Sequence, residues 1–364
     1  MQKHWKVYNP NPRLQASLSD ALGVHPIIAQ LLVNRGITDI QEAKDFLSAD
    51  LSSLHDPFLL KNMKKAVERI QKAQTNKERI LVVGDYDVDG ITSSVLLNNI
   101  FKQMDVEVVH HIPHRLQDGY GLNASIGQTA KEAGASLLIA VDCGITAKKE
   151  VDLINQEGID VIVIDHHQPD DGQLPDAVAI INPKQHDCPY PFKHLASVGL
   201  VAKLAQALFG ASGSEKNLDL VAVGTVADVV PLRGENRIFV KAGLPKINKT
   251  KNIGLLALLD ITNIRGKKLS PFHIGFILGP RINAAGRMDS AQTSLDLLLS
   301  EDHQEAQGLA QMLDKHNLDR QRIQQKIVEE AFEIAEQEVN FKDQKIIVLG
   351  KEGWHRGVLG IVAS

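Results

Sequence analysis

The sequence has few cysteines and no long apolar run, and each scarcity excludes a class of protein. Only two cysteines, Cys143 and Cys188, occur in 364 residues, too few and too widely spaced for a disulfide framework or a zinc site. No stretch of eighteen apolar residues is present, and residues 2–6 lead into the polar run Asn-Pro-Asn-Pro and not into an apolar leader. We therefore expect a soluble, cytoplasmic protein with no membrane partner.

The length and the net charge of the chain limit the kinds of protein that it can be. A chain of 364 residues exceeds what one hydrophobic core usually serves, so two or more lobes are expected, and the 43% hydrophobic content is enough to build their cores. A net charge of -4 does not by itself indicate a nucleic-acid binder. Acidic residues that bind cations reverse their local sign, however, so local basic residues are more informative than the total.

The spacing of apolar residues changes along the chain and divides it into regions. Residues 1–76 contain amphipathic pieces, such as 26–32 and 40–47, and predict a helical N-terminal extension. Residues 77–235 alternate short β-branched runs with helical segments, a pattern typical of an α/β domain with a parallel sheet flanked by helices. The predicted strands are 80–83, 106–112, 137–141, 161–164 and 178–181.

The remaining residues predict helices and the start of a second lobe. Residues 236–293 are interpreted as a helical subdomain with an exposed loop, and the polar, helically spaced residues 294–340 as a long connector helix. The apolar run 345–350 predicts a strand that opens a second α/β lobe at 341–364. Because so short a lobe cannot bury a core, we expect it to be truncated and the chain to be a fragment of a longer protein.

Four short segments bearing aspartate or histidine follow apolar runs of the predicted α/β domain. They are Asp85-Tyr86-Asp87-Val88-Asp89-Gly90, Asp142-Cys143-Gly144, Asp165-His166-His167 and Ala227-Asp228. In open parallel sheets, ligands bind beyond the carboxyl ends of the strands. Carboxylates and neutral imidazoles are ligands for Mn²⁺ or Mg²⁺, and a pair of such ions can clamp both oxygens of a phosphoryl displacement. Together the segments predict a two-metal hydrolase site.

Each segment taken alone has a plainer interpretation. The alternating acids of 85–90 also fit a solvated turn or a calcium loop, although the glutamate that ends an EF-hand loop is missing. Asp142 alone fits a helix N-cap. A helix that begins near Ile91 would direct its free N–H groups toward phosphate.

The two adjacent histidines raise a question of direction. Neighbouring residues of a strand point to opposite faces, so at most one of His166 and His167 is expected to meet a given metal. The other would donate to a substrate phosphate. Asp165 would orient a ring nitrogen, as carboxylates commonly do beside a metal-ligating histidine.

These segments are accompanied by three further motifs, and the whole set resembles the DHH phosphoesterase superfamily. The additional motifs are Ile112-Pro113-His114-Arg115 with Gly119-Tyr120-Gly121-Leu122-Asn123, the run from Gly279 to Met288, and the run from Gly357 to Ser364. Within the superfamily they resemble the RecJ family of single-strand-specific exonucleases, from about residue 77 to residue 364. The second lobe resembles that family's DHHA1 domain.

The resemblance implies a role for each candidate residue. Asp87 would bind one metal ion, Asp89, His166 and Asp228 would bind the other, and Asp142 would bridge them. His167 would contact the scissile phosphate, and Asp85 would be a further ligand or support one. Two ions of Mn²⁺ or Mg²⁺ are implied, with 5′ to 3′ hydrolysis of single-stranded DNA to 5′-mononucleotides in DNA repair and recombination.

Further residues are assigned to DNA. Arg281, Asn283 and Arg287 are expected to lie in a loop and contact phosphate or the DNA backbone, the alternative being a surface turn with solvated arginines. Arg115 would bind the terminal phosphate, and Tyr120 would stack on a base. Two residues of the second lobe, His355 and Arg356, would also contact the substrate.

The resemblance also sets the partners and the rival functions. Single-stranded DNA is the expected partner, together with a single-strand-binding protein and a RecQ-type helicase. The sequence places Val83-Gly84 where many members have a histidine before the glycine, so an imidazole is absent from the first metal's ligands. The alternatives are a DHH phosphodiesterase for short oligonucleotides or cyclic dinucleotides, and a non-catalytic DNA-binding protein. The helical extension and the retained ligands argue against these two.

Overall fold

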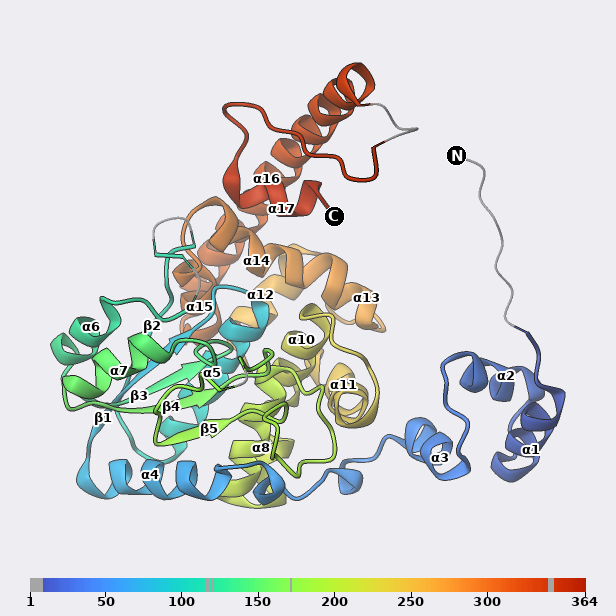
Figure 1. The fold of residues 1–364 in the computed structure, drawn as a ribbon, viewed down its shortest axis with the longest axis horizontal. Helices are drawn as coiled ribbons and strands as arrows, with labels where there is room; N and C mark the ends of the chain where they lie inside the picture. The colour runs from blue at the N-terminus through green and yellow to red at the C-terminus, as the bar shows by residue number, and fades with distance from the viewer. Residues whose placement is uncertain (1–8, 116–117, 120, 171, 340–343) are drawn as a thin grey trace.

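A computed structural model describes residues 9–115, 118–119, 121–170, 172–339 and 344–364. The described chain has a small helical unit at its N-terminal side, an α/β body, a helical layer above that body, and a long helix that carries the C-terminal segment (Figure 1). No single described helix is long and apolar enough to cross a membrane, and the helices Pro12–Leu22 and Pro26–Asn34 meet that test only as a pair bent by 118°.

The body is built on a five-stranded parallel sheet in the order β2-β1-β3-β4-β5. All five strands predicted from the sequence are confirmed, with somewhat different ends. Chain order reverses between β1 and β3, and ligand sites in such sheets lie beyond the strand ends at this reversal. The strands are β1 (Arg79–Gly84), β2 (Val108–His111), β3 (Ala135–Val141), β4 (Asp160–Ile164) and β5 (Ala179–Ile181).

Helices cover both faces of the sheet because successive side chains of a buried strand point to opposite sides. In β1, Ile80 and Val82 face a core shared with α4, α5 and α8, whereas Leu81 and Val83 face α6 and α7. This explains why the strands are apolar throughout. The helices of the body are α4 (Met63–Asn76), α5 (Val88–Gln103), α6 (Ile126–Glu132), α7 (Lys148–Gln156), α8 (Ser197–Phe209), α9 (Ala211–Glu215) and α10 (Leu218–Ala227).

The N-terminal extension is only partly separate from the body. Helices α1 (Pro12–Leu22), α2 (Pro26–Asn34) and α3 (Ile40–Ser48) share a small core of their own. Two short turns, η1 (Leu51–Ser53) and η2 (Pro57–Leu59), follow. Helix α4, which the sequence places in the extension, packs in the core beneath the sheet through Met63, Ala66 and Ile70.

A buried ion pair fastens this connection to the body. Lys203 of α8 and Glu235 are fully buried, and the Lys203 Nζ lies 3.1 Å from the Glu235 Oε1. The same carboxylate accepts the His55 backbone N–H at 3.0 Å and the Tyr190 hydroxyl at 2.6 Å. We call these four residues the Lys203 network. Each charged group in it has an opposite or polar partner.

A helical layer lies above the body, and residues 236–293, predicted to be helical, lie mostly in it. Its core joins Val88, Ile91 and Val95 of α5 to the helices that follow α10. The segment expected to be an exposed loop at 281–288 is instead helical, so that prediction was wrong. The elements are α11 (Gly234–Ile247), α12 (Ile253–Ile261), α13 (Pro271–His273), the π-helical turn η3 (Ile274–Leu278), α14 (Gly279–Met288) and α15 (Gln292–Leu299).

The predicted connector is two helices, because Asp302 caps a new helix, α16 (His303–Glu338), after α15 has ended. The strand predicted at 345–350 does not form, and Ile346 and Val348 are 78% and 87% exposed. A strand requires a hydrogen-bonded neighbour, and none of the described segments supplies one. The short helix α17 (Arg356–Val362) packs on α14 and α16.

Candidate metal centre and nucleic-acid interface

The four acidic or histidine-bearing segments come together beyond the carboxyl ends of β1, β3 and β4. Among the residues that the structure describes, three groups of potential metal ligands occur, and within each group the ligand atoms lie within 4.8 Å of one another. All their members belong to these segments. We call their members the ligand cluster. The groups are Asp85, Asp87 and Asp142; Asp89, His166 and Asp228; and Asp142, His166 and His167.

Asp142 lies at the centre of the ligand cluster. It follows β3 in a left-handed conformation with φ of 63°, which aspartate tolerates better than most residues. Its backbone N–H donates to the Ile164 carbonyl at 2.9 Å, and the Ser197 hydroxyl donates to its Oδ1 at 2.9 Å. Asp142 caps no helix, since α7 begins six residues later with Ala147 as its N-cap. The plainer interpretation is thereby excluded.

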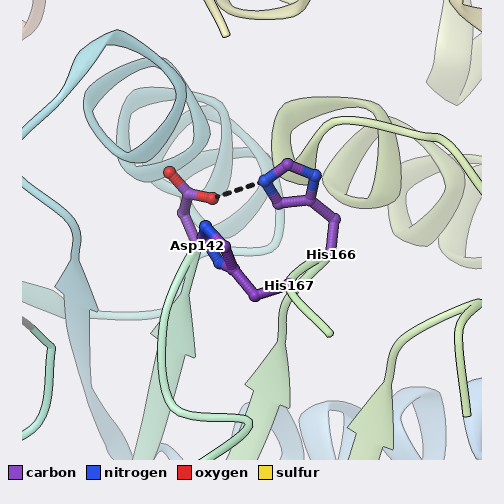
Figure 2. Close-up of side chains that lie close together, drawn as sticks. All are labelled: Asp142, His166 and His167. Atoms are coloured by element: carbon purple, nitrogen blue, oxygen red, sulfur yellow. Dashed lines mark ion pairs between the residues drawn. The ribbon is translucent and has the colours of Figure 1, made fainter. Parts of the chain in front are cut away.

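The two histidines lie on the same side of the site, contrary to the prediction that they diverge. Figure 2 shows both rings next to Asp142, with ring centroids 4.6 Å apart. The His166 Nε2 lies 3.4 Å from the Asp142 Oδ1 and 3.6 Å from the Asp228 Oδ2. Strand β4 ends at Ile164, so the alternation of strand side chains no longer applies to residues 166 and 167.

Asp165 orients His167 and not His166. Its Oδ1 accepts the His167 backbone N–H at 3.0 Å and lies 2.8 Å from the His167 Nδ1, while its Oδ2 accepts the Ile145 N–H at 3.0 Å. Burial acts to raise the pKa of Asp165, but the bonds from His167 outweigh it and the pKa is lowered. The hydrogen bond that the His167 ring donates to Asp165 raises the pKa of His167. Asp165 thus pairs with an imidazole as predicted, but the imidazole is that of His167 and not that of the proposed ligand His166.

The N-terminus of α8 holds the fully buried Asp89. The backbone N–H groups of Ser197 and Val198 donate to its two carboxylate oxygens at 2.7 and 2.9 Å. A helix N-terminus favours a negative charge. Sequence reasoning missed Ser197 as a supporting residue. Its only local signal was a serine before an apolar helical pattern, which is a common start of a helix.

The helix after β1 begins at Val88, three residues earlier than predicted, and side chains of the protein occupy its first N–H groups. Asp87 accepts from the N–H groups of Asp89 and Gly90 at 2.9 and 3.2 Å, and Asn283 accepts from Val88 at 3.1 Å. This end of α5 is therefore capped. The expectation that it presents free N–H donors to phosphate was wrong.

The ligand cluster concentrates negative charge in a buried space. Burial, followed by the charge of Asp87, raises the pKa of Asp85 to about 7 and that of Asp228 to about 7. Burial and neighbouring carboxylates raise the pKa of Asp89 and of Asp142 well above the usual value. Burial, with the charge of His167, lowers the pKa of His166 to about 4, so its ring is neutral near pH 7. Neutral imidazole is the form that binds metal.

The cluster also contains polar atoms that the protein does not satisfy. Asp85 Oδ1, His166 Nε2 and Asp228 Oδ2 are buried and have no hydrogen-bond partner within the described parts of the chain. Such atoms are rare in folded proteins and call for a ligand or ion. Divalent cations fit this donor set of aspartate oxygens and one neutral imidazole.

A group of arginines lies beside the ligand cluster. The Arg115 guanidinium lies over the Tyr86 ring, 4.7 Å from its centroid. Burial lowers the pKa of Arg287, and the charges of Arg115 and Arg320 lower it further. Arg320, on α16, was missed by sequence reasoning. Its guanidinium is held by Asn317 and Gln324, each 2.7 Å away, and no local pattern in that polar helix distinguishes it.

The other residues predicted to contact DNA have varied positions. Arg281 pairs with Asp314 at 2.8 Å and bonds the Ile277 carbonyl, so it has structural contacts. His355 caps α17, and Arg356 is exposed. Tyr120 lies outside the described residues. These DNA contacts remain predictions.

The parallel sheet, with the ligand cluster at its reversal, defines a domain of the DHH type. The model of the DHH family, N-terminal domain, matches residues 79–225. The chain is 42% identical over 360 residues to the single-stranded-DNA-specific exonuclease RecJ of Bacillus subtilis (strain 168), covering 99% of this chain and 45% of that protein.

Solved structures agree with this likeness. RecJ of Thermus thermophilus in complex with Mn²⁺ matches with a TM-score of 0.81 and 31% identity, over 97% of this chain and 50% of that one. A structure of exonuclease RecJ bound to manganese matches with a TM-score of 0.75 and 34% identity, over 84% of this chain and 76% of that one. The chain belongs to the RecJ family. It spans about half the length of the Bacillus relative.

Proposed function

We propose that the chain carries the catalytic part of a metal-dependent exonuclease that hydrolyses single-stranded DNA from its 5′ end to 5′-mononucleotides. The supporting observation is the pair of ligand groups, Asp85 with Asp87 and Asp142, and Asp89 with His166 and Asp228, which meet where Asp142 and His166 are 3.4 Å apart. The names of the relatives, which are single-stranded-DNA-specific exonucleases, support the choice of substrate.

The ligand cluster suits two ions of Mn²⁺ or Mg²⁺. The first group would hold one ion and the second group the other, with Asp142 shared between them. When bound, such a pair neutralises charge on a phosphodiester and lowers the pKa of water. The first ion would have carboxylate ligands only, since Val83 stands in place of the imidazole common in the family.

His167 would act on the substrate directly. Its side chain is 46% exposed, whereas His166 is 9% exposed. Because Asp165 raises the pKa of His167, its ring carries more positive charge near neutral pH than an ordinary histidine. Such a ring can donate a hydrogen bond to a non-bridging oxygen of the scissile phosphate, and its charge opposes the negative charge that develops there.

The arginine group would set the 5′ polarity. The charges of Arg115 and Arg320 both act on Arg287, and Arg115 lies over the Tyr86 ring. Guanidinium groups bind phosphate strongly. A terminal 5′-phosphate held there would present the first phosphodiester to the ligand cluster. A single-strand-binding protein and a RecQ-type helicase remain proposed partners through family likeness alone.

The deciding experiment compares loss of label from 5′-labelled and 3′-labelled single-stranded DNA with Mn²⁺ present. The full-length parent protein is assayed with duplex DNA, short RNA and a cyclic dinucleotide in parallel. Early loss of the 5′ label from single strands supports the proposal. Hydrolysis of only the short or cyclic substrates would assign the protein to the alternative, a small-substrate DHH phosphodiesterase.

A further inference from the structure

Two phenylalanines are stacked on each other at the surface of the helical layer. Phe272 and Phe276 are 59% and 72% exposed, with ring centroids 5.0 Å apart and an interplanar angle of 25°. His273 lies edge-on to Phe272 at 5.9 Å. Large aromatic side chains are usually buried, so two that stack in the open are candidates for a binding surface.

The backbone holds both rings outward. Phe272 and Phe276 are four residues apart, and the intervening Ile274 and the following Leu278 are fully buried on the opposite side. The segment Ile274–Leu278 is a π-helical turn between two α-helical stretches. Such turns are uncommon and frequently occur at functional sites. The buried pair anchors the helix, so the rings do not depend on a ligand for their orientation.

The helix that bears the rings continues to the ligand cluster. Gly279 follows Phe276 by three residues, or about 5 Å of helix rise. A methyl group at Gly279 would lie 3.4 Å from the Cβ of Ala227 and 3.9 Å from the Cγ2 of Val88. These two residues adjoin the candidate ligands Asp228 and Asp87 in sequence. The rings are therefore within a few nucleotides of the ligand cluster.

The chain that leads into this helix is basic. Lys267 and Lys268 are exposed, a few residues before Phe272, and Arg265 stands before them, 2.9 Å from Asp260. Stacking aromatic rings beside positive charge are the means by which proteins bind single strands without reading their sequence. An apolar partner helix would make less use of the lysines.

We propose that Phe272 and Phe276 form a stacking platform for bases of the DNA strand on the 3′ side of the scissile nucleotide. The inference rests on the proposed function and deepens it, since it names the residues that would hold the undigested strand. Lys267 and Lys268 would contact its phosphates. The platform binds bases of any sequence, because every base offers an aromatic face.

The test measures equilibrium binding of oligothymidylates of about 4 and about 16 nucleotides, the longer one carrying 2-aminopurine at internal positions. The full-length protein is used in EDTA, so that no hydrolysis occurs. The double variant Phe272→Leu/Phe276→Leu keeps apolar bulk and removes the aromatic faces. We expect its Kd for the long strand to rise about 5- to 100-fold, a smaller change for the short strand, and loss of 2-aminopurine quenching.

Matched controls separate stacking from general damage. Phe58→Leu removes another phenylalanine that is 50% exposed, on η2 beneath the body, and should leave both Kd values unchanged. Phe276→Trp keeps an aromatic face and should retain tight binding. Thermal unfolding of each variant checks the fold.

The outcomes distinguish this proposal from the proposed function. Unchanged long-strand binding in the folded double variant would overturn the platform, even if the parent degrades DNA as expected. Equal losses with Phe58→Leu, or weak binding by Phe276→Trp, would also overturn it. Suppose that the double variant binds the long strand more weakly and that the unmodified full-length protein does not hydrolyse DNA. That result would support the platform and refute the nuclease.

Discussion

Two buried polar clusters in the same domain are built in opposite ways. In the Lys203 network the lysine charge faces Glu235, and the remaining oxygen of that carboxylate accepts the Tyr190 hydroxyl. In the ligand cluster, carboxylates face carboxylates, and Asp85, Asp89 and Asp228 form no ion pair with a lysine or arginine anywhere in the described chain. One cluster is complete within the protein, and the other has the clustered carboxylates and unsatisfied ligand atoms of a candidate cation site. The difference distinguishes groups whose partners all lie within the fold from groups left available for a ligand.

The largest expected effect comes from removing the central carboxylate of the ligand cluster. Asp142→Ala should lower Mn²⁺-dependent hydrolysis of single-stranded DNA by about 10³-fold or more, since both proposed ions lose a ligand. The fold should persist, because Asp142 contributes to the ligand cluster and not to an apolar core. Circular dichroism and kcat of the purified variant are the measurements. Activity equal to the parent in a folded Asp142→Ala protein would refute the site.

The second prediction concerns the Lys203 network. Glu235→Gln leaves the buried Lys203 charge without its carboxylate, and we expect the free energy of unfolding to fall by about 3–5 kcal/mol. Urea titration measures this loss. Mn²⁺ affinity should be unchanged in the folded variant. If Glu235→Gln unfolded at the parental urea concentration, the contrast between the two clusters would be wrong.

The third prediction uses pH to separate the clusters. The pKa values of Asp85 and Asp228 in the folded protein, about 7, lie above those of an unfolded chain. Below about pH 6.5 the opposite effect comes from His110 and His166, whose pKa values burial lowers to about 4. Above that pH the folded state binds extra protons, and its stability should fall as pH rises from about 6.5 to about 8. His167, whose pKa is also raised, acts in the same direction. Saturating Mn²⁺ should remove the loss in thermal unfolding midpoint, and a fall that persists with Mn²⁺ would contradict the account.

The smallest expected effect is at an exposed ion pair. Lys61 and Asp187 lie 2.6 Å apart, and the Asp187 side chain is 64% exposed. Asp187→Asn should leave the urea midpoint of unfolding close to that of the unmodified protein, since water screens the pair. Urea titration beside Glu235→Gln makes the comparison direct. A loss of stability as large as that of Glu235→Gln would show that burial does not determine how much an ion pair contributes to stability.

The sequence predicted the sheet and the ligand cluster well because both depend on local patterns. Runs such as 137–141 and 161–164 are buried on both faces, and the residues that follow them meet at one edge. Support from distant segments was not predictable in this way. Ser197 reaches Asp142 across 55 positions, and Arg320 joins Arg287 from a polar helix.

Two errors have identifiable physical causes. The Gly, Pro and Ala residues near 280 suggested a loop, but Pro280 occupies the first turn of α14, where proline is tolerated. The apolar run at 345–350 has the composition of a strand, but composition cannot supply the neighbour that a strand needs.

Gly90 sets the spacing of the ligand cluster. It lies in the first turn of α5, where a side chain would stand 2.4 Å from the Asp85 carbonyl oxygen and 2.6 Å from its nitrogen. Any larger residue would push α5, with Asp87 and Asp89, away from Asp85. The absence of a side chain at Gly90 therefore sets the distance between the two proposed ions. A larger residue there would change that distance although it replaces no proposed ligand.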